Sequence, residues 1–161
     1  MNLVFNRYTI VYLTVLALSG CASFEPVKAY DGRIKNGKEV ATIVGQKYRK
    51  AWNNRVGVFV GRVDGKATPN VWIGFPYVIQ VDPGTHDLEI GGFYGNLYHQ
   101  TLPKIRVLVE AGKVYQIDSQ LGRTANGGTG ASYSLRYFGK WEEYEDYLAK
   151  HPEYERGTPL S

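Results

Sequence analysis

Apolar side chains recur at every second position over short runs between Glu39 and Phe138, as they do in half-buried β-strands. The runs cover residues 40–44, 56–60, 77–81, 86–90, 105–109, 115–117 and 131–137. This pattern predicts an all-β domain over residues 39–139, an antiparallel β-sandwich of about seven strands, with a small barrel as the alternative.

Turn signals separate these runs, at residues 63–65, 82–86 and 110–113. Pro83 fixes its own φ and Gly84 accepts a positive φ, so this pair favours a tight turn. The third signal is expected to close a hairpin. Three other stretches are predicted to be loops: residues 47–50, the stretch that contains Gly91 and Gly92, and residues 122–130.

Helical spacing replaces the alternation after the last strand. Trp141, Tyr144 and Leu148 share one helical face. Acidic residues near the start and Lys150 near the end complement the helix dipole, and Pro152 ends the pattern. We therefore expect a short C-terminal α-helix over about residues 140–150, within a final segment 140–161. It either packs on the sandwich or covers an edge strand.

The first 20 residues have the pattern of an export signal. A short basic region ends at Arg7, and an apolar run from Tyr8 to Leu18 follows it. This run is shorter than the roughly 20 apolar residues that span a bilayer. Ser19 and Gly20 then lead into Cys21, the only cysteine of the chain.

The stretch Leu18-Ser19-Gly20-Cys21 resembles the lipobox of bacterial lipoproteins. The resemblance implies cleavage between Gly20 and Cys21, diacylation of the Cys21 sulfur and acylation of the new amine. Ala22 then implies sorting to the inner leaflet of the outer membrane, facing the periplasm. Residues 21–38 would form the lipidated N-terminus and a tether. An uncleaved signal anchor and a core cysteine remain the alternatives.

The β region has a second resemblance, carried by "EVATIV", "VDG", "VDPGTHDLEI" and "VEAGKVYQID" in that order. This order is similar to small envelope lipoproteins of poorly defined function and to PEGA-type surface domains, whose β-sandwiches carry a Pro-Gly turn before an alternating strand. The PEGA tetrapeptide itself is absent. The resemblance covers residues 39–118 and implies a sandwich fold without an activity.

Charge and motifs exclude several classes of function. The net charge is +4 and no dense basic cluster is present, so we expect no nucleic-acid partner. Catalytic and metal-binding motifs are absent, and we expect neither an enzyme nor a cofactor. His86 is expected to hydrogen-bond the Pro-Gly turn. A metal site formed by His86, Asp87 and His99 is the less favoured alternative.

Aromatic residues between glycines are the best indication of a binding surface. Four residues in these stretches are candidate ligand-binding residues that could contact sugars or a peptide, unless they fill the core: Trp72, Tyr94, Tyr98 and His99. The sequence thus favours a non-catalytic binding or assembly module of the envelope, held on a membrane by its lipid anchor. Its partner would be an envelope protein or peptidoglycan. A glycan-binding module and a periplasmic hydrolase are the alternatives, and no oligomeric state is predicted.

Overall fold

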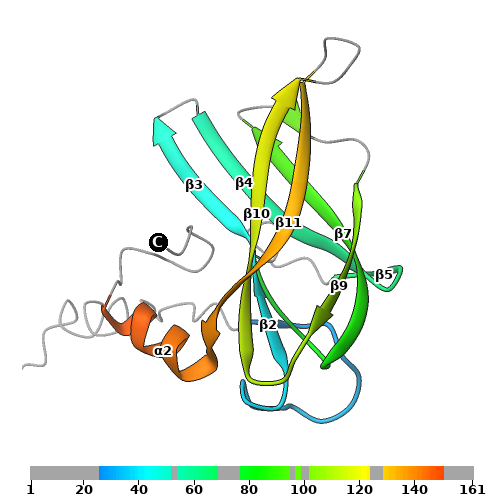
Figure 1. Cartoon of the computed structure of the whole chain (residues 1–161), viewed down its shortest axis with the longest axis vertical. Coiled ribbons are helices and arrows are strands. Elements are labelled where there is room, and N and C mark those ends of the chain that lie inside the picture. Colours follow the sequence, from blue (N-terminus) through cyan, green and yellow to red (C-terminus); the bar gives the residue numbers. More distant parts are fainter. Residues whose placement is uncertain are drawn as a thin grey trace, which may run out of the picture.

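In the part of the chain that the computed structural model describes, two β-sheets face each other and a C-terminal helix packs beside them (Figure 1). The structure describes residues 26–51, 54–68, 77–94, 97–98, 102–123 and 129–150. Over these residues the predicted all-β, sandwich-like fold with a short C-terminal helix is confirmed.

Sheet A takes its strands from both halves of the chain. Its order is β1 (Val27–Lys28), β6 (Val78–Val81), β2 (Ala41–Val44), β10 (Lys113–Arg123) and β11 (Thr129–Lys140). Two of its pairings are parallel, β1 with β6 and β2 with β10. The sandwich is therefore mixed rather than purely antiparallel.

Sheet B is antiparallel and is built around two long neighbouring strands. Its main order is β3 (Gln46–Ala51), β4 (Asn54–Val63), β7 (Gly84–Tyr94) and β8 (Leu97–Tyr98). The short strand β5 (Lys66–Ala67) pairs with β4, and β9 (Lys104–Val109) pairs with β7.

Two of the predicted loops are wrong. Residues 47–50 lie in β3, which pairs with β4, and Gly91 and Gly92 lie inside β7. The third, 122–130, is shorter than expected because β10 reaches Arg123 and β11 starts at Thr129. Residues between these two ends lie outside the described part of the chain.

The chain passes between the two sheets at several connections, and a glycine lies at two of these corners. Strand β2 continues into β3 through Gly45, whose N–H donates to the Tyr77 carbonyl at 2.6 Å. A Cβ on Gly45 would overlap the Val58 carbonyl oxygen, so the corner requires glycine. The second corner is the turn after β9, where Gly112 has φ +70°. The hairpin predicted here is wrong, because β9 belongs to sheet B and β10 to sheet A.

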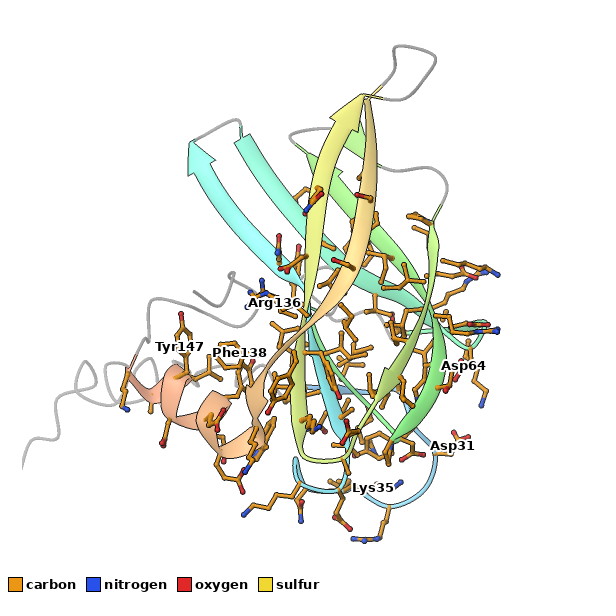
Figure 2. The ribbon with its side chains drawn as sticks, viewed as in Figure 1. Asp31, Lys35, Asp64, Arg136, Phe138 and Tyr147 are labelled. Atoms are coloured by element: carbon orange, nitrogen blue, oxygen red, sulfur yellow. The ribbon has the colours of Figure 1, made fainter. Side chains whose placement is uncertain are left out.

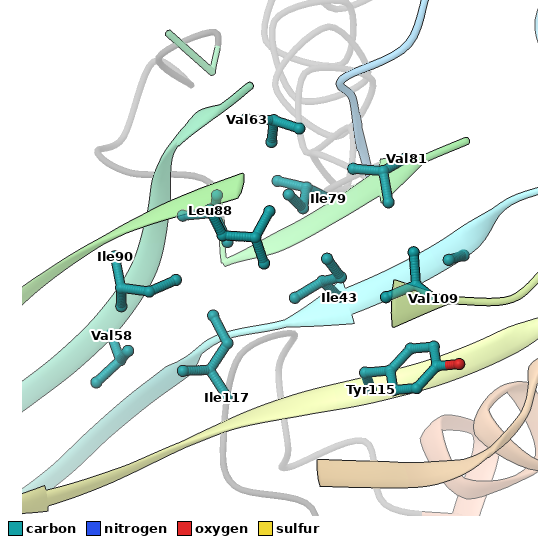
Figure 3. Close-up of a cluster of buried hydrophobic side chains, with 12 residues drawn as sticks. Ile43, Val58, Val63, Ile79, Val81, Leu88, Ile90, Val109, Tyr115 and Ile117 are labelled. Atoms are coloured by element: carbon teal, nitrogen blue, oxygen red, sulfur yellow. The ribbon is translucent and has the colours of Figure 1, made fainter. Parts of the chain in front are cut away.

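The main core fills the space between the sheets (Figure 3). Each of its central side chains is at most 8% exposed, and both sheets contribute: Ala41, Ile43, Val58, Val60, Val63, Ile79, Val81, Leu88, Ile90, Val109, Tyr115 and Ile117. These are largely the alternating positions that the sequence marks as inward-facing, and burying them stabilises the fold by roughly 1.5–3 kcal/mol per large side chain.

Helix α2 (Trp141–Lys150) covers the outer face of sheet A and matches the predicted helix. Tyr144 is 2% exposed and packs in a second cluster with Val44, Val78 and Val114. Phe138 and Tyr147 contact each other edge-on, with ring centroids 5.6 Å apart (Figure 2). The helix thus packs on a sheet face rather than on an edge strand.

The chain enters the fold earlier than the expected boundary at residue 39. Strand β1 pairs with β6, and the Ala29 N–H donates to the Gln80 carbonyl at 2.8 Å. Gly37 is buried against the Trp141 ring, where a Cβ would overlap the indole. Residues from Val27 onward therefore belong to the packed domain. Among the described residues, no helix combines the length and apolar character that crossing a bilayer requires.

Candidate functional site

The aromatic residues predicted to bind a ligand are only partly placed by the structure. Trp72 and His99 lie outside the described residues, as do Gly20 and Cys21. Tyr94 lies in β7 opposite Leu97, and Tyr98 lies in β8 opposite Phe93. The two tyrosines are therefore not cross-strand partners, and this binding site stays a prediction.

His86 holds a corner of the sandwich together. Its Nε2 lies 2.7 Å from the Asp82 carbonyl oxygen, so the expected bond to the Pro-Gly turn is confirmed. Its Nδ1 lies 2.7 Å from Oδ2 of Asp64, whose Oδ1 accepts the Asp87 N–H at 2.9 Å. The bond with His86 is the main cause that lowers the pKa of Asp64 from its ordinary value of 3.8. One imidazole thus joins the β4–β5 turn to the β6–β7 turn.

The alternative metal site at this corner is not assembled in the described residues. His86 and Asp87 are neighbours in β7 and so point to opposite faces of the sheet. Asp87 instead accepts two hydrogen bonds from Arg106, at 2.7 and 2.9 Å. Within the described ranges, no cluster of three or more His, Cys, Asp or Glu side chains could hold a metal ion.

A cavity of about 340 Å³ lies beside His86, between β1 and the β4–β5 hairpin. Charged side chains around it pair with one another: Lys66 with Asp31 at 3.3 Å, and Lys35 with Asp82. Figure 2 shows Asp31, Lys35 and Asp64 along this end of the molecule. Because most of its charges are paired within the cluster, the cluster fits a structural role better than a ligand site.

A larger groove separates two edge strands on the other side of the sandwich. Among the described residues, β9 pairs only with β7, and β11 pairs only with β10. The strands belong to different sheets, and the turn after β9 joins these sheets at one end (Figure 1). The space between β9 and β11 measures about 640 Å³, and its lining includes Ile105, Val107, Leu108, Tyr133, Leu135 and Tyr137.

The walls of this groove are mainly apolar and aromatic. Tyr133, Leu135 and Tyr137 face inward from β11, since the register sets them opposite Ser119, Ile117 and Tyr115. Burial raises the pKa of the Tyr133 phenol above its ordinary value of 10.0.

Two apolar side chains at the rim are open to solvent. Leu108 is 71% exposed and Tyr137 is 48% exposed. The Tyr137 ring packs edge-on against Tyr115, with centroids 5.9 Å apart, and lies under the Lys113 ammonium at 5.5 Å. The exposed phenol is thus held in place before any ligand arrives.

The backbone of β9 also faces the groove. The Ile90 N–H donates to the Pro103 carbonyl at 2.9 Å, so this pair is hydrogen-bonded. Bonded and non-bonded pairs alternate along an antiparallel ladder, so Ile105 and Val107 also bond to β7. The N–H and C=O groups of Lys104, Arg106 and Leu108 therefore point away from β7, toward the groove.

One sequence signal for this groove exists. Along β9, Lys104, Arg106 and Leu108 occupy the solvent-facing positions of the alternation, and Leu108 is apolar where a polar residue is expected. The groove also requires that β9 pairs only with β7 and β11 only with β10 among the described strands. No local feature of the sequence indicates this pairing.

Comparison of the chain with protein-family models, with curated proteins and with solved structures finds no match. The candidate site therefore rests on its own geometry. Its lining is aliphatic and phenolic with one serine and one arginine, and this composition suits binding better than acid–base chemistry.

Proposed function

We propose that this protein is a non-catalytic binding or assembly module of the bacterial envelope, anchored through a lipidated Cys21 and facing the periplasm. The groove between β9 and β11 is the observation that carries the binding role. Its volume of about 640 Å³ falls within the usual range of ligand sites, and the exposed Leu108 lies on it. Exposed apolar side chains gathered at a groove commonly mark an interaction site.

The lipobox resemblance at Cys21 supports the anchor. Each buried CH₂ group contributes about 0.8 kcal/mol, and more than one acyl chain is needed for stable attachment. A lipoprotein with three chains would therefore stay at the bilayer while its domain samples the periplasm.

Peptidoglycan is the second candidate ligand, and Tyr137 favours it. Its ring is half exposed, and its edge-on contact with Tyr115 fixes its orientation. Such a ring offers an apolar face on which a sugar could stack.

The anchor is tested by metabolic palmitate labelling and separation of the two membranes. The wild-type chain should be labelled and should sediment with the outer membrane. Cys21→Ser should lose the label and keep the mobility of an unprocessed precursor. The control Ser19→Ala should be labelled and should sediment with the outer membrane, as the wild type does. Label that persists in Cys21→Ser would contradict the anchor.

The binding role is tested by a photocrosslinking amino acid placed at Leu108 or Tyr137 in living cells. Both positions should give adducts, whereas the exposed position Glu145 on α2 should give none. Protease-sensitive and lysozyme-sensitive adducts separate protein from peptidoglycan partners. Equal labelling at all three positions would remove the groove from the proposal.

A further inference from the structure

We infer that the groove accepts an extended segment of a partner polypeptide, which adds to sheet B as a new strand beside β9. This inference rests on the proposed binding role of the groove. It specifies the chemistry of the ligand: apolar side chains at alternate positions, and acidic side chains at the positions between them.

The backbone of β9 is the first argument. Lys104, Arg106 and Leu108 direct N–H and C=O groups toward the groove, at the spacing of every second residue. An added strand satisfies these donors and acceptors in a regular ladder. An acyl chain has no groups that can do so, and a sugar does not repeat its hydroxyls at this spacing. The six residues of β9 span about 20 Å, and the part of this length that β11 does not approach is available for the ladder.

The inner face of the groove is the second argument. Successive residues of a strand alternate between two faces, so half of the incoming side chains would point into the groove. There they would meet Ile105 and Val107 from β9, and Tyr133 and Leu135 from β11. These four side chains are only partly buried, and they pack against the edge of the main core. Apolar side chains at every second position of the ligand would complete their burial.

The charge of the outer face is the third argument. Lys104 and Arg106 point outward from β9, with 70% and 74% of their side chains exposed. Among the described residues, Lys104 and Arg62 both pair with Glu89, and Arg106 pairs with Asp87, so three cations share two carboxylates on this face. Oppositely charged residues directly across a strand pair attract, so acidic residues of the ligand fit opposite these cations. A second copy of β9 would present the same cations and is disfavoured for this reason.

The probes are three synthetic ten-residue peptides added to the full chain in detergent micelles. The first alternates glutamate with valine or phenylalanine, the second replaces each glutamate with lysine, and the third has the composition of the first in scrambled order. By fluorescence anisotropy the first should bind about tenfold or more tightly than the second, because attraction at two cross-strand positions becomes repulsion. The scrambled peptide should bind weakly. Equal affinity of all three would overturn the inference.

Charge reversal on the protein gives a matched test. The double variant Lys104→Glu and Arg106→Glu should invert the preference, so that the lysine peptide binds more tightly than the glutamate peptide. Lys66→Glu makes the same kind of charge change on β5, away from the groove, and should keep the wild-type preference. Circular dichroism checks that each variant is folded. An unchanged preference in the folded double variant would contradict strand addition at β9.

Amide hydrogen exchange distinguishes strand addition from other binding modes. On adding the first peptide, the amides of Arg106 and Leu108 should exchange at least tenfold more slowly, while those of Ile105 and Val107, already bonded to β7, should change little. Binding of peptidoglycan fragments or lipid that depends on Tyr137, without this protection, would overturn the strand inference and leave the binding role intact. Failure of every probe, together with an absence of crosslinks at Leu108 and Tyr137, would overturn both.

Discussion

At the scale of single residues, Gly45 shows how one position determines the connection between the sheets. The chain leaves sheet A and enters sheet B there, and the missing side chain lets the Val58 carbonyl approach the Gly45 backbone. A backbone carbonyl within a paired strand cannot rotate aside. The sequence marks this glycine only as an interruption after an alternating run.

Gly45→Ala should destabilise the fold by about 3 kcal/mol, since the added methyl group overlaps backbone rather than a flexible side chain. Urea unfolding measures the change. Gly61→Ala is the matched control, because its Cβ would lie 2.9 Å from a terminal carbon of Leu102, which can move. A loss for Gly45→Ala no larger than that for Gly61→Ala would contradict the role of Gly45 in this corner.

The bond between Asp64 and His86 predicts a dependence on pH. The pKa of Asp64 is lowered in the fold, chiefly by His86, so its stabilising contribution is present above its ordinary value of 3.8 and is lost as the pH falls through the lower folded value. Asp64→Asn should therefore reduce the free energy of unfolding at pH 7. It should also flatten the decrease of that free energy as the pH falls below about 4.

Unfolding curves at several pH values measure this effect, with Asp146→Asn on the exposed side of α2 as the control. The control should follow the wild type at every pH. If Asp64→Asn also followed the wild type, the hydrogen bond to His86 would contribute nothing to acid stability.

At the scale of elements, α2 is positioned by contacts at its first turn. The Glu143 carboxylate accepts the Lys140 N–H at 3.1 Å, and the Trp141 N–H donates to the Gly112 carbonyl at 2.9 Å. These bonds satisfy backbone groups that a helix start otherwise leaves open. They also place Tyr144 over the outer face of sheet A.

Tyr144→Ala should cost about 3 kcal/mol in the free energy of unfolding, because it removes a ring that is 2% exposed. Glu145→Ala, one residue further along the same helix, should change it by less than about 0.5 kcal/mol. Chemical unfolding followed by circular dichroism compares the two. Equal effects would mean that the helix does not stabilise the sandwich through its buried face.

The predicted elements show what local pattern can and cannot reveal. The alternation identifies most core positions, and the i, i+3, i+7 spacing identifies the helix. The glycines of β7 were expected in a loop because glycine is depleted in strands. In the fold, however, the Phe59 ring covers Gly91 and the Phe93 ring covers Gly57 across the strand pair. Such compensation depends on which strands pair, and this is not a local property of the sequence.

The groove between β9 and β11 was not predicted from the sequence, and the reason is related. A groove between β9 and β11 exists because neither strand pairs with the other, although about 20 residues separate their ends in the chain. Only the apolar Leu108 at a solvent-facing position indicated it. Of the four aromatic and histidine residues predicted to bind a ligand, Trp72 and His99 lie outside the described residues.

At the scale of the whole molecule, the described part of the sandwich is open between β9 and β11, which each pair with only one strand there. Amide hydrogen exchange without any ligand should show this difference. Amides of β2 and β7, which have strand neighbours on both sides, should exchange most slowly. The amides of Arg106 and Leu108, which point to the groove, should exchange much faster than those of Ile105 and Val107 in the same strand. Equal protection along β9 would mean that its free edge is covered.

The order of strands in sheet A determines how far its two edges lie from the N-terminal end of the domain. Strand β1 lies at one edge of that sheet and β11 at the other, four strand spacings or about 19 Å away. With Cys21 lipidated as proposed, the six residue steps from Cys21 to Val27 could span at most about 22 Å. The β1 edge would then stay within this distance of the bilayer, whereas the β11 edge would be able to reach further into the aqueous space. Under this proposal the groove beside β11 would be open to partners in the periplasm and not only to neighbours in the same leaflet.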